Sequence, residues 1–106
     1  MDTPQNDNRR FLYFYFNRDQ PEKIKQAVPA RIQYWRSVNA KGYMGGPFTD
    51  RTSGLISFVA SSAEEAAAII RQDPFILEDL VNQKWIKEWL LETPESEQSA
   101  SKGKQS

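Results

Sequence analysis

The chain lacks two residue types on which proteins rely for much of their chemistry, because its 106 residues include no cysteine and no histidine. Without cysteine there can be no disulfide, no thiolate nucleophile and no thiolate metal site. Histidine is the usual general base near neutral pH and the commonest metal ligand, so its absence removes both roles. We therefore expect neither a metal site nor a cofactor.

An excess of charge and long apolar runs are also missing. Fourteen basic residues balance fourteen acidic ones, so overall charge favours neither nucleic acid nor an anionic membrane. Lys84 and Lys87 alternate with Trp85 and Trp89, a pattern that suits stacking on single strands, but Glu88 interrupts it. No apolar run reaches the ~20 residues of a membrane helix, and the polar start lacks a signal-peptide core. We expect a cytoplasmic protein with no nucleic-acid or membrane partner.

The composition that is present predicts one globular domain. Hydrophobic residues make up 39% of the chain and charged residues 26%, which is typical of a folded domain rather than a disordered one. Residues 1–10 are polar and predict a mobile lead-in. Residues 93–106 consist mainly of Ser, Glu, Gln and Lys and predict a disordered polar tail. The domain should therefore span residues 11–92.

The strongest strand signal is Phe11–Phe16, with the sequence FLYFYF. Aromatic residues favour strands, yet this run does not alternate with polar residues as a half-buried antiparallel strand does. Phe11, Tyr13 and Tyr15 would face one side of a sheet, and Leu12, Phe14 and Phe16 the other. Two helices can cover only one side of such a sheet. We infer that the other side packs on the sheet of a partner subunit, giving a homodimer.

Two helical segments follow the apolar periodicity. Ile24, Val28, Ile32, Trp35 and Val38 recur at three- and four-residue steps. Since proline disfavours a helix interior, Pro29 predicts a short turn at 21–27 and a main helix at 29–41. Gly42 would be the C-cap. Asp19 with Glu22, and Ser62 with Glu65, have capping-box spacing at the starts of the two helical segments.

The remaining segments complete a recognisable order. Residues 50–54 predict a hairpin between an edge strand containing Gly45, Gly46 and Pro47 and a central apolar strand at 54–60. Asp73-Pro74 should end the second helix, a short turn or helix should follow at 75–81, and a last strand at 82–92. The order β-α-β-β-α-β predicts an α+β, ferredoxin-like antiparallel sheet.

On this pattern the chain resembles the YciI-like proteins (YCII-related domain) from about Phe11 to Leu91. The resemblance is carried by the aromatic first strand, by Ala30-Arg31-Ile32 eleven residues before Gly42, by Gly46-Pro47-Phe48 and by Asp73-Pro74-Phe75. It implies a dimeric α+β barrel. It also implies a site in which a histidine at the start of the main helix pairs with the aspartate of the Asp-Pro motif, for proton transfer on small, often aromatic, acids.

Carried over by position, the aspartate is Asp73, but the histidine position holds Arg31. A guanidinium stays protonated and cannot act as a general base, although it can hold a carboxylate or phosphate with two hydrogen bonds. Three interpretations of the pair remain open. Arg31 and Asp73 form a structural ion pair, or Arg31 binds an anionic ligand, or Asp73 is a catalytic base.

Several aromatic and glycine residues are candidates for the walls of such a site. Tyr13, Trp35 and Phe48 are either core residues or ligand contacts, and Tyr15 is open to the same two interpretations. Gly46 either serves the geometry of its strand or helps to bind a ligand. With Arg31 and Asp73, these residues give the candidate site Arg31, Gly46, Phe48, Asp73, Tyr13 and Trp35.

Three classes of function follow from these alternatives. The favoured one is a dimeric module that binds a small anionic or aromatic ligand near Arg31. The second is a lyase or isomerase on small cyclic acids with Asp73 as base. The third is a non-enzymatic scaffold that works through protein contacts.

Overall fold

The computed structural model describes residues 9–92. The predicted lead-in and tail, apart from Arg9 and Arg10, lie outside this part. The strands are β1 (Arg9–Asn17), β2 (Lys41–Pro47), β3 (Ser53–Ala60) and β4 (Val81–Trp89). The helices are α2 (Pro21–Val38), α3 (Ala63–Arg71) and the single turn α4 (Pro74–Leu77). No helix in this part of the chain is long and apolar enough to cross a membrane.

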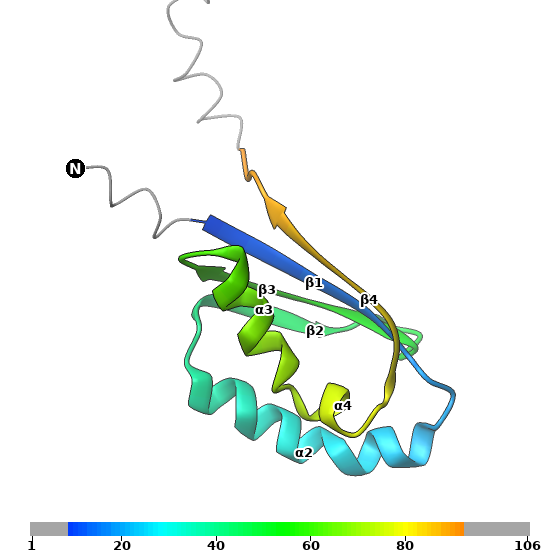
Figure 1. Cartoon of the computed structure of the whole chain (residues 1–106). Coiled ribbons are helices and arrows are strands. Elements are labelled where there is room, and N and C mark those ends of the chain that lie inside the picture. The colour runs from blue at the N-terminus through cyan, green and yellow to red at the C-terminus, as the bar shows by residue number, and fades with distance from the viewer. Residues whose placement is uncertain (1–8, 93–106) are drawn as a thin grey trace, which may run out of the picture.

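The strands form one antiparallel sheet in the order β2-β3-β1-β4. All three helices lie on one face of this sheet (Figure 1). The ferredoxin-like α+β prediction is therefore confirmed. The predicted positions within the sheet are also correct, because β2, which contains Gly45, Gly46 and Pro47, is an edge strand and β3 is central.

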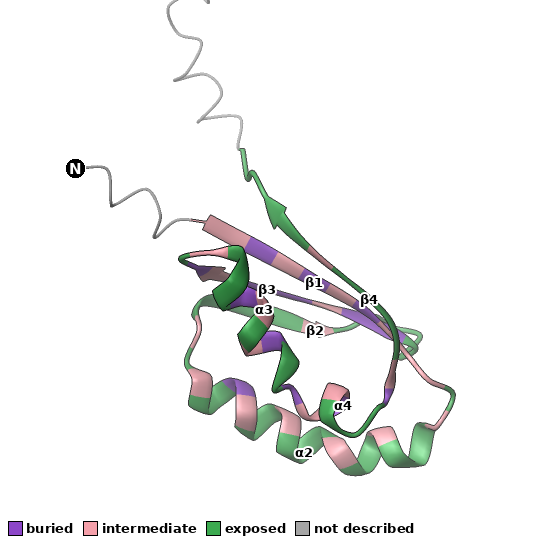
Figure 2. Cartoon of the chain, in the orientation of Figure 1, coloured by how far each residue is buried: buried purple, intermediate pink, exposed green. Residues whose placement is uncertain are grey.

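Burial along β1 alternates between the two faces. Phe11, Tyr13 and Tyr15 are buried under the helices, whereas Leu12, Phe14 and Phe16 are only half-buried. The core is formed by this buried set with Ile56 and Phe58 of β3 and with residues from α2 and α3, as the purple segments of Figure 2 show. Residues 9–92 of one chain thus cover only one side of its aromatic strand.

The prediction of a helix interrupted at Pro29 is wrong. Helix α2 runs without a break from Pro21 to Val38 with Pro29 inside it. The fixed φ of proline is compatible with a helix, so the local loss is the bond that an N–H at position 29 would give to the carbonyl of Lys25. The intact turns on both sides keep the helix continuous.

The predicted caps of α2 are also wrong at both ends. With Pro21 at the first turn, the N-cap is Gln20 and no side chain caps it, so Asp19 lies one residue too early for a capping box. The helix ends at Asn39, which takes the left-handed conformation at φ 54°. Gly42, the predicted C-cap, lies inside β2 at φ +63°, where the pairing with β3 is irregular.

The second capping prediction is confirmed in a modified form. The Ser62 hydroxyl accepts a hydrogen bond from the Glu65 N–H at 3.0 Å. The Glu65 carboxylate accepts a hydrogen bond from the N–H of Ser61 at 2.7 Å, whereas in a capping box it would accept from that of Ser62. Asp73 then caps the next element, because its carboxylate accepts the Phe75 N–H at the start of α4.

Candidate functional site

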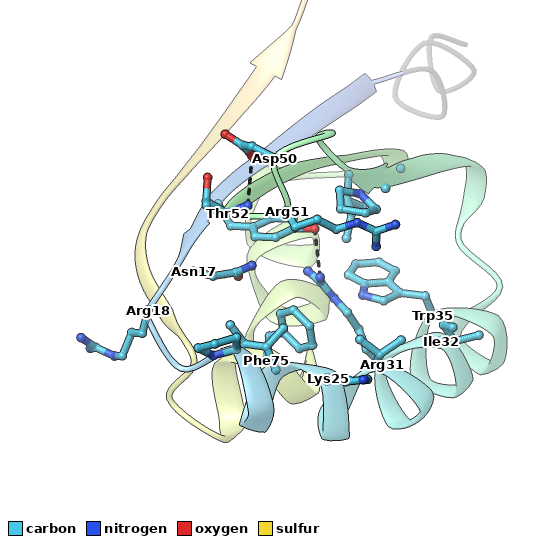
Figure 3. Close-up of a pocket in the computed structure, with 18 of the residues that line it drawn as sticks. Asn17, Arg18, Lys25, Arg31, Ile32, Trp35, Asp50, Arg51, Thr52 and Phe75 are labelled. Carbon is cyan, nitrogen blue, oxygen red and sulfur yellow. Dashed lines mark hydrogen bonds between the residues drawn. The ribbon is translucent and has the colours of Figure 1, made fainter.

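A cavity of about 840 Å³ lies between α2 and the end of the sheet where β1 and β2 finish. Its walls come from the end of β1 and the turn after it, one face of α2, β2, the β2–β3 hairpin turn and Phe75 of α4. Figure 3 shows these side chains around the cavity. The volume is within the range of small-molecule pockets, about 300–1,000 Å³.

The apolar stripe of α2 explains why the cavity is there. The only buried residue of this helix is Trp35 near its C-terminal end. Ile32, Val28 and Ile24, about one, two and three turns earlier, line the cavity, and Ile32 is 52% exposed. The N-terminal half of α2 therefore presents an apolar face to open space instead of to the sheet, as a wall for an apolar ligand would.

The guanidinium of Arg31 is the central polar group of the wall. Its Nε donates to Asp73 Oδ2 at 3.0 Å and its Nη1 donates to the Tyr15 hydroxyl at 3.0 Å. Its carbon lies 4.3 Å from the centroid of the Tyr15 ring and 4.0 Å from that of Phe75. The remaining nitrogen, Nη2, is buried and has no hydrogen-bond partner within residues 9–92.

This arrangement corrects the expectation of a bidentate grip. Aromatic rings cover the guanidinium, and two of its three nitrogens are bonded to protein groups. Within residues 9–92, Nη2 is thus the only nitrogen of this guanidinium without a hydrogen-bond partner. Arg31 could therefore give one further charge-assisted hydrogen bond instead of two.

Asp73 is fully buried beneath this wall and does not line the cavity. Its carboxylate accepts three hydrogen bonds, from Arg31 Nε, from the Trp35 indole at 2.9 Å and from the Phe75 N–H at 2.7 Å. The first interpretation of the pair, a structural ion pair, thus describes the contact that is observed. Asp73 holds Arg31 and Trp35 in position, and its oxygens face protein donors.

Gly54 makes room for Tyr15, its partner across β1 and β3. A Cβ at Gly54 would overlap the ring and the hydroxyl of Tyr15. The absence of a side chain at Gly54 therefore leaves room for the tyrosine ring, and the Tyr15 hydroxyl accepts its hydrogen bond from Arg31 Nη1.

The rim of the cavity is polar and of mixed charge. Arg18, Lys25 and Arg51 line it together with Asp19 and Asp50. Asp50 accepts the Thr52 N–H at 3.0 Å, and this bond holds the pKa of Asp50 below its usual value. Tyr43 lies on the β2 side, where burial raises the pKa of its hydroxyl. Within residues 9–92 no group of three or more acidic side chains could hold a metal ion.

The structure brings together only part of the site proposed from the sequence. Arg31, Gly46 and Trp35 line the cavity. Tyr13 is fully buried in the core below it, with a hydroxyl whose pKa is raised mainly by burial. Phe48 lies away from the cavity with its ring 5.8 Å from that of Phe14.

Among the wall residues outside the candidate site proposed from the sequence are Tyr15, Asn17 and Phe75. The period of two along β1 could have found the first two, because Tyr13, Tyr15 and Asn17 follow one another on the same strand face. Phe75 is the third residue of the Asp-Pro-Phe motif. It takes part because Asp73 binds its N–H and turns the start of α4 toward Arg31.

The sheet face opposite the helices carries a second aromatic group. The rings of Phe14, Phe16, Phe48 and Trp85 contact one another at centroid distances of 4.9 to 5.8 Å. Trp85 and Phe48 are 44% and 42% exposed. We call these four residues the open-face cluster.

The fold is also that of a solved enzyme. The 5-chloro-2-hydroxyhydroquinone dehydrochlorinase of Burkholderia phenoliruptrix, in its complex with 2,5-dihydroxybenzoquinone, superposes with a TM-score of 0.67 at 22% sequence identity. The match covers 76% of this chain and 92% of the dehydrochlorinase chain. No curated protein matches the chain at a significant level.

Residues 10–90 match the family model described as the YCII-related domain, which includes β1, the Arg31–Asp73 pair and the walls of the cavity. The resemblance drawn from Gly46-Pro47-Phe48 and Asp73-Pro74-Phe75 is thereby confirmed. The chain belongs to the family of YCII-related domains.

Proposed function

We propose that this protein binds a small aromatic anion in the cavity between α2 and the sheet, and that it does so without general-base catalysis. The observation that carries the proposal is the state of Arg31. A permanently charged guanidinium is fixed by Asp73 and by two aromatic rings, and one of its nitrogens is left without a protein partner beside an apolar-walled cavity. A ligand oxygen would supply the missing partner.

The walls favour an aromatic or conjugated body for this ligand. Ile24, Val28 and Ile32 on one side and Phe75 on the other offer apolar surface, and burying such surface favours binding by ~25 cal/mol per Å². The related dehydrochlorinase is seen with 2,5-dihydroxybenzoquinone, a planar ring with oxygen substituents. A ligand of similar kind would fit an apolar cavity with a single cationic contact.

The lyase or isomerase alternative requires a base that reaches the ligand. Asp73 is fully buried and its carboxylate is engaged by three donors, whereas a general base must lie within hydrogen-bond reach of the proton it removes. Arg31 cannot take the role because it stays protonated. Turnover of a lactone or a chlorinated hydroxyquinone that is lost in Asp73→Asn would contradict the binding-module proposal.

A charge placed at the mouth of the cavity tests the proposal without disturbing the Arg31–Asp73 pair. Ile32→Glu adds a carboxylate at a half-exposed wall residue, and Gln33→Glu adds the same charge one residue on, where the exposed side chain does not line the cavity. Calorimetric titration with benzoate should show binding to the wild type. Ile32→Glu should weaken it about five- to ten-fold by repulsion, and Gln33→Glu should leave it within about two-fold.

Two controls separate the contributions of charge and ring. Inorganic phosphate and benzyl alcohol each keep one of the two features, so each should bind more weakly than benzoate. Equal weakening by Ile32→Glu and Gln33→Glu would place the anion outside this cavity, and no binding of any aromatic acid would refute the proposal.

We also propose that the open-face cluster packs on the same cluster of a second copy. Four rings from β1, β4 and the end of β2 form a contiguous apolar surface on the side without helices. Exposed apolar patches of this kind mark interaction surfaces. The cavity opens on the other face, so dimerisation and ligand binding can be tested independently.

A further inference from the structure

The unpartnered polar atoms of the protein concentrate at the cavity. Within residues 9–92, three buried side-chain polar atoms have no hydrogen-bond partner: the Tyr13 hydroxyl, Asn17 Oδ1 and Arg31 Nη2. Asn17 and Arg31 both line the cavity. Folded proteins pair the great majority of such atoms, because leaving one unpaired lowers stability. Two buried polar atoms without a hydrogen-bond partner thus belong to residues in the wall of one cavity, and we look for one cause for both.

Asn17 is held in place by its backbone and not by its side chain. It is the last residue of β1, where the pairing with β4 changes register. Its backbone N–H donates to the carbonyl of Thr52 at 2.8 Å, which ties the end of β1 to the hairpin turn. The side-chain oxygen takes no part in this contact. A purely structural role does not account for an amide at this position.

Asn17 and Arg31 face the same space. In Figure 3 the Asn17 amide and the Arg31 guanidinium both extend toward the middle of the cavity, from β1 and α2, with Phe75 also at the wall. Arg31 Nη2 can only donate a hydrogen bond, whereas a primary amide both donates and accepts. Rotating the side-chain amide group of Asn17 by half a revolution about its last bond exchanges its oxygen and nitrogen, with almost no change of shape.

We infer that the ligand is an aromatic acid that also carries a ring hydroxyl, with the acid oxygen at Arg31 Nη2 and the hydroxyl at the amide of Asn17. This inference rests on the proposed function and adds the second polar group. A hydroxyl suits the amide in either orientation, because it donates to the oxygen and accepts from the nitrogen. A second carboxylate can only accept, so it suits the amide in one orientation only, with the nitrogen toward the ligand.

The test combines ligands and variants in one cycle. Benzoate and its three hydroxylated isomers are titrated calorimetrically into the wild type, Asn17→Leu and Gln33→Leu. Leucine keeps the approximate shape of asparagine but has no polar atoms, and Gln33 supplies an exposed control amide on α2 outside the cavity. In the wild type, the best hydroxybenzoate should bind about five-fold tighter than benzoate, as expected for one added hydrogen bond. Asn17→Leu should abolish this preference, and Gln33→Leu should retain it.

Thermal melting of the free proteins gives a second readout that a structural role would not reproduce. Removing an unpaired buried acceptor loses no hydrogen bond, so Asn17→Leu should melt at the wild-type temperature or above it. A clear fall in melting temperature would show that the amide supports the fold and would overturn the inference. The inference would also be overturned if Asn17→Leu still preferred the hydroxylated ligand. It would be overturned as well if the wild type bound benzoate but showed no preference for a hydroxybenzoate. Failure of every aromatic acid to bind would overturn the proposed function as well.

Discussion

At the scale of single residues, one carboxylate decides which atoms of Arg31 are left for a ligand. Asp73 takes Nε, and Tyr15 takes Nη1. Within residues 9–92 the guanidinium therefore has one nitrogen free to donate a hydrogen bond, instead of the two that a bidentate contact needs. The arginine at this position is therefore more than a group that cannot act as a base, because it forms a fixed unit with the buried aspartate.

Two aspartates allow the energy of this unit to be measured against a matched control. Asp73 and Asp79 each pair with an arginine, but the Asp73 side chain is 0% exposed and the Asp79 side chain is 81% exposed. Asp73→Asn should lower the free energy of unfolding by about 3–5 kcal/mol, because it leaves Arg31 as an uncompensated, mostly buried charge. Asp79→Asn should change it by about 1 kcal/mol or less. Urea denaturation measures both, and equal effects would contradict the assigned role of Asp73.

The tyrosines predict how stability depends on alkaline pH. Burial is the main cause that raises the pKa of Tyr13, Tyr34 and Tyr43, three of the four tyrosines. In the unfolded chain tyrosines lose their protons near pH ~10. Above that pH the native state binds more protons than the unfolded state, so the free energy of unfolding should fall as pH rises.

Ultraviolet absorbance of tyrosinate, followed together with circular dichroism, tests this prediction. The fully buried Tyr13 should ionise only as the protein unfolds, and Tyr34 and Tyr43 should ionise at a higher pH in the folded protein than in urea, where all four should ionise near pH ~10. Ionisation of all four near that pH in a protein that stays folded would contradict it.

Some residue roles could be predicted from the sequence and others could not. The pairing of Arg31 with Asp73 was implied by the family resemblance, and the burial of Trp35 agrees with its place in the apolar stripe of α2. The roles of Tyr13 and Phe48 depended on which sheet face each side chain takes. Phe48 lies just beyond the last residue of β2, where the hairpin geometry rather than the strand period sets its direction. Asn17 carried no motif at all.

At the scale of elements, the cavity depends on the ends of β1 and β2, which lie on either side of β3, and on helix α2 across from them. The stripe Ile24, Val28 and Ile32 has the spacing of a core-facing helix, and sequence alone cannot tell whether such a stripe meets a sheet or a cavity. Pro29 was read as a break because the loss of one donor was weighed without the helical turns on either side. The order of strands and helices, in contrast, followed from turn residues and apolar runs.

The pairing of Gly54 with Tyr15 gives a prediction at this scale. Gly54→Ala should lower the free energy of unfolding by about 1–3 kcal/mol, because the added Cβ overlaps Tyr15 and forces its ring off the strand. Gly46→Ala is the matched control, since a Cβ there meets no atom within 4 Å. It should change stability by about 0.5 kcal/mol or less. Chemical denaturation of the two variants measures both changes. If Gly54→Ala left the free energy of unfolding unchanged, Tyr15 would not be held in place by the glycine.

At the scale of the whole molecule, the two faces of the sheet serve different purposes. One is covered by helices and opens into the cavity at its end, and the other presents the open-face cluster. The non-alternating strand Phe11–Phe16 predicted that both faces need cover. In the part of the chain that the structure describes, helices cover one side only, and a second copy of the chain remains our proposal for the other.

Phe14→Asp tests that proposal. A carboxylate among the rings of the open-face cluster should abolish the dimer or the fold, because it removes packing of about 3–5 kcal/mol and buries an unpaired charge. Leu77→Asp, at a residue of α4 that is 62% exposed, should leave the association unchanged. Sedimentation at micromolar concentration gives the answer, and a wild type that is monomeric there would refute the dimer.

The central claim, that an aromatic anion binds beside Arg31 in the cavity, is tested most directly by nuclear magnetic resonance of the isotope-labelled protein during titration with benzoate. The indole N–H of Trp35 donates to Asp73, whereas Trp85 and Trp89 belong to β4. We predict saturable shifts of the Trp35 indole signal and of the Arg31 Nε signal, with the Trp85 and Trp89 indole signals unmoved. Saturable shifts confined to Trp85 and Trp89, or no saturable shift at any of these groups, would contradict the account.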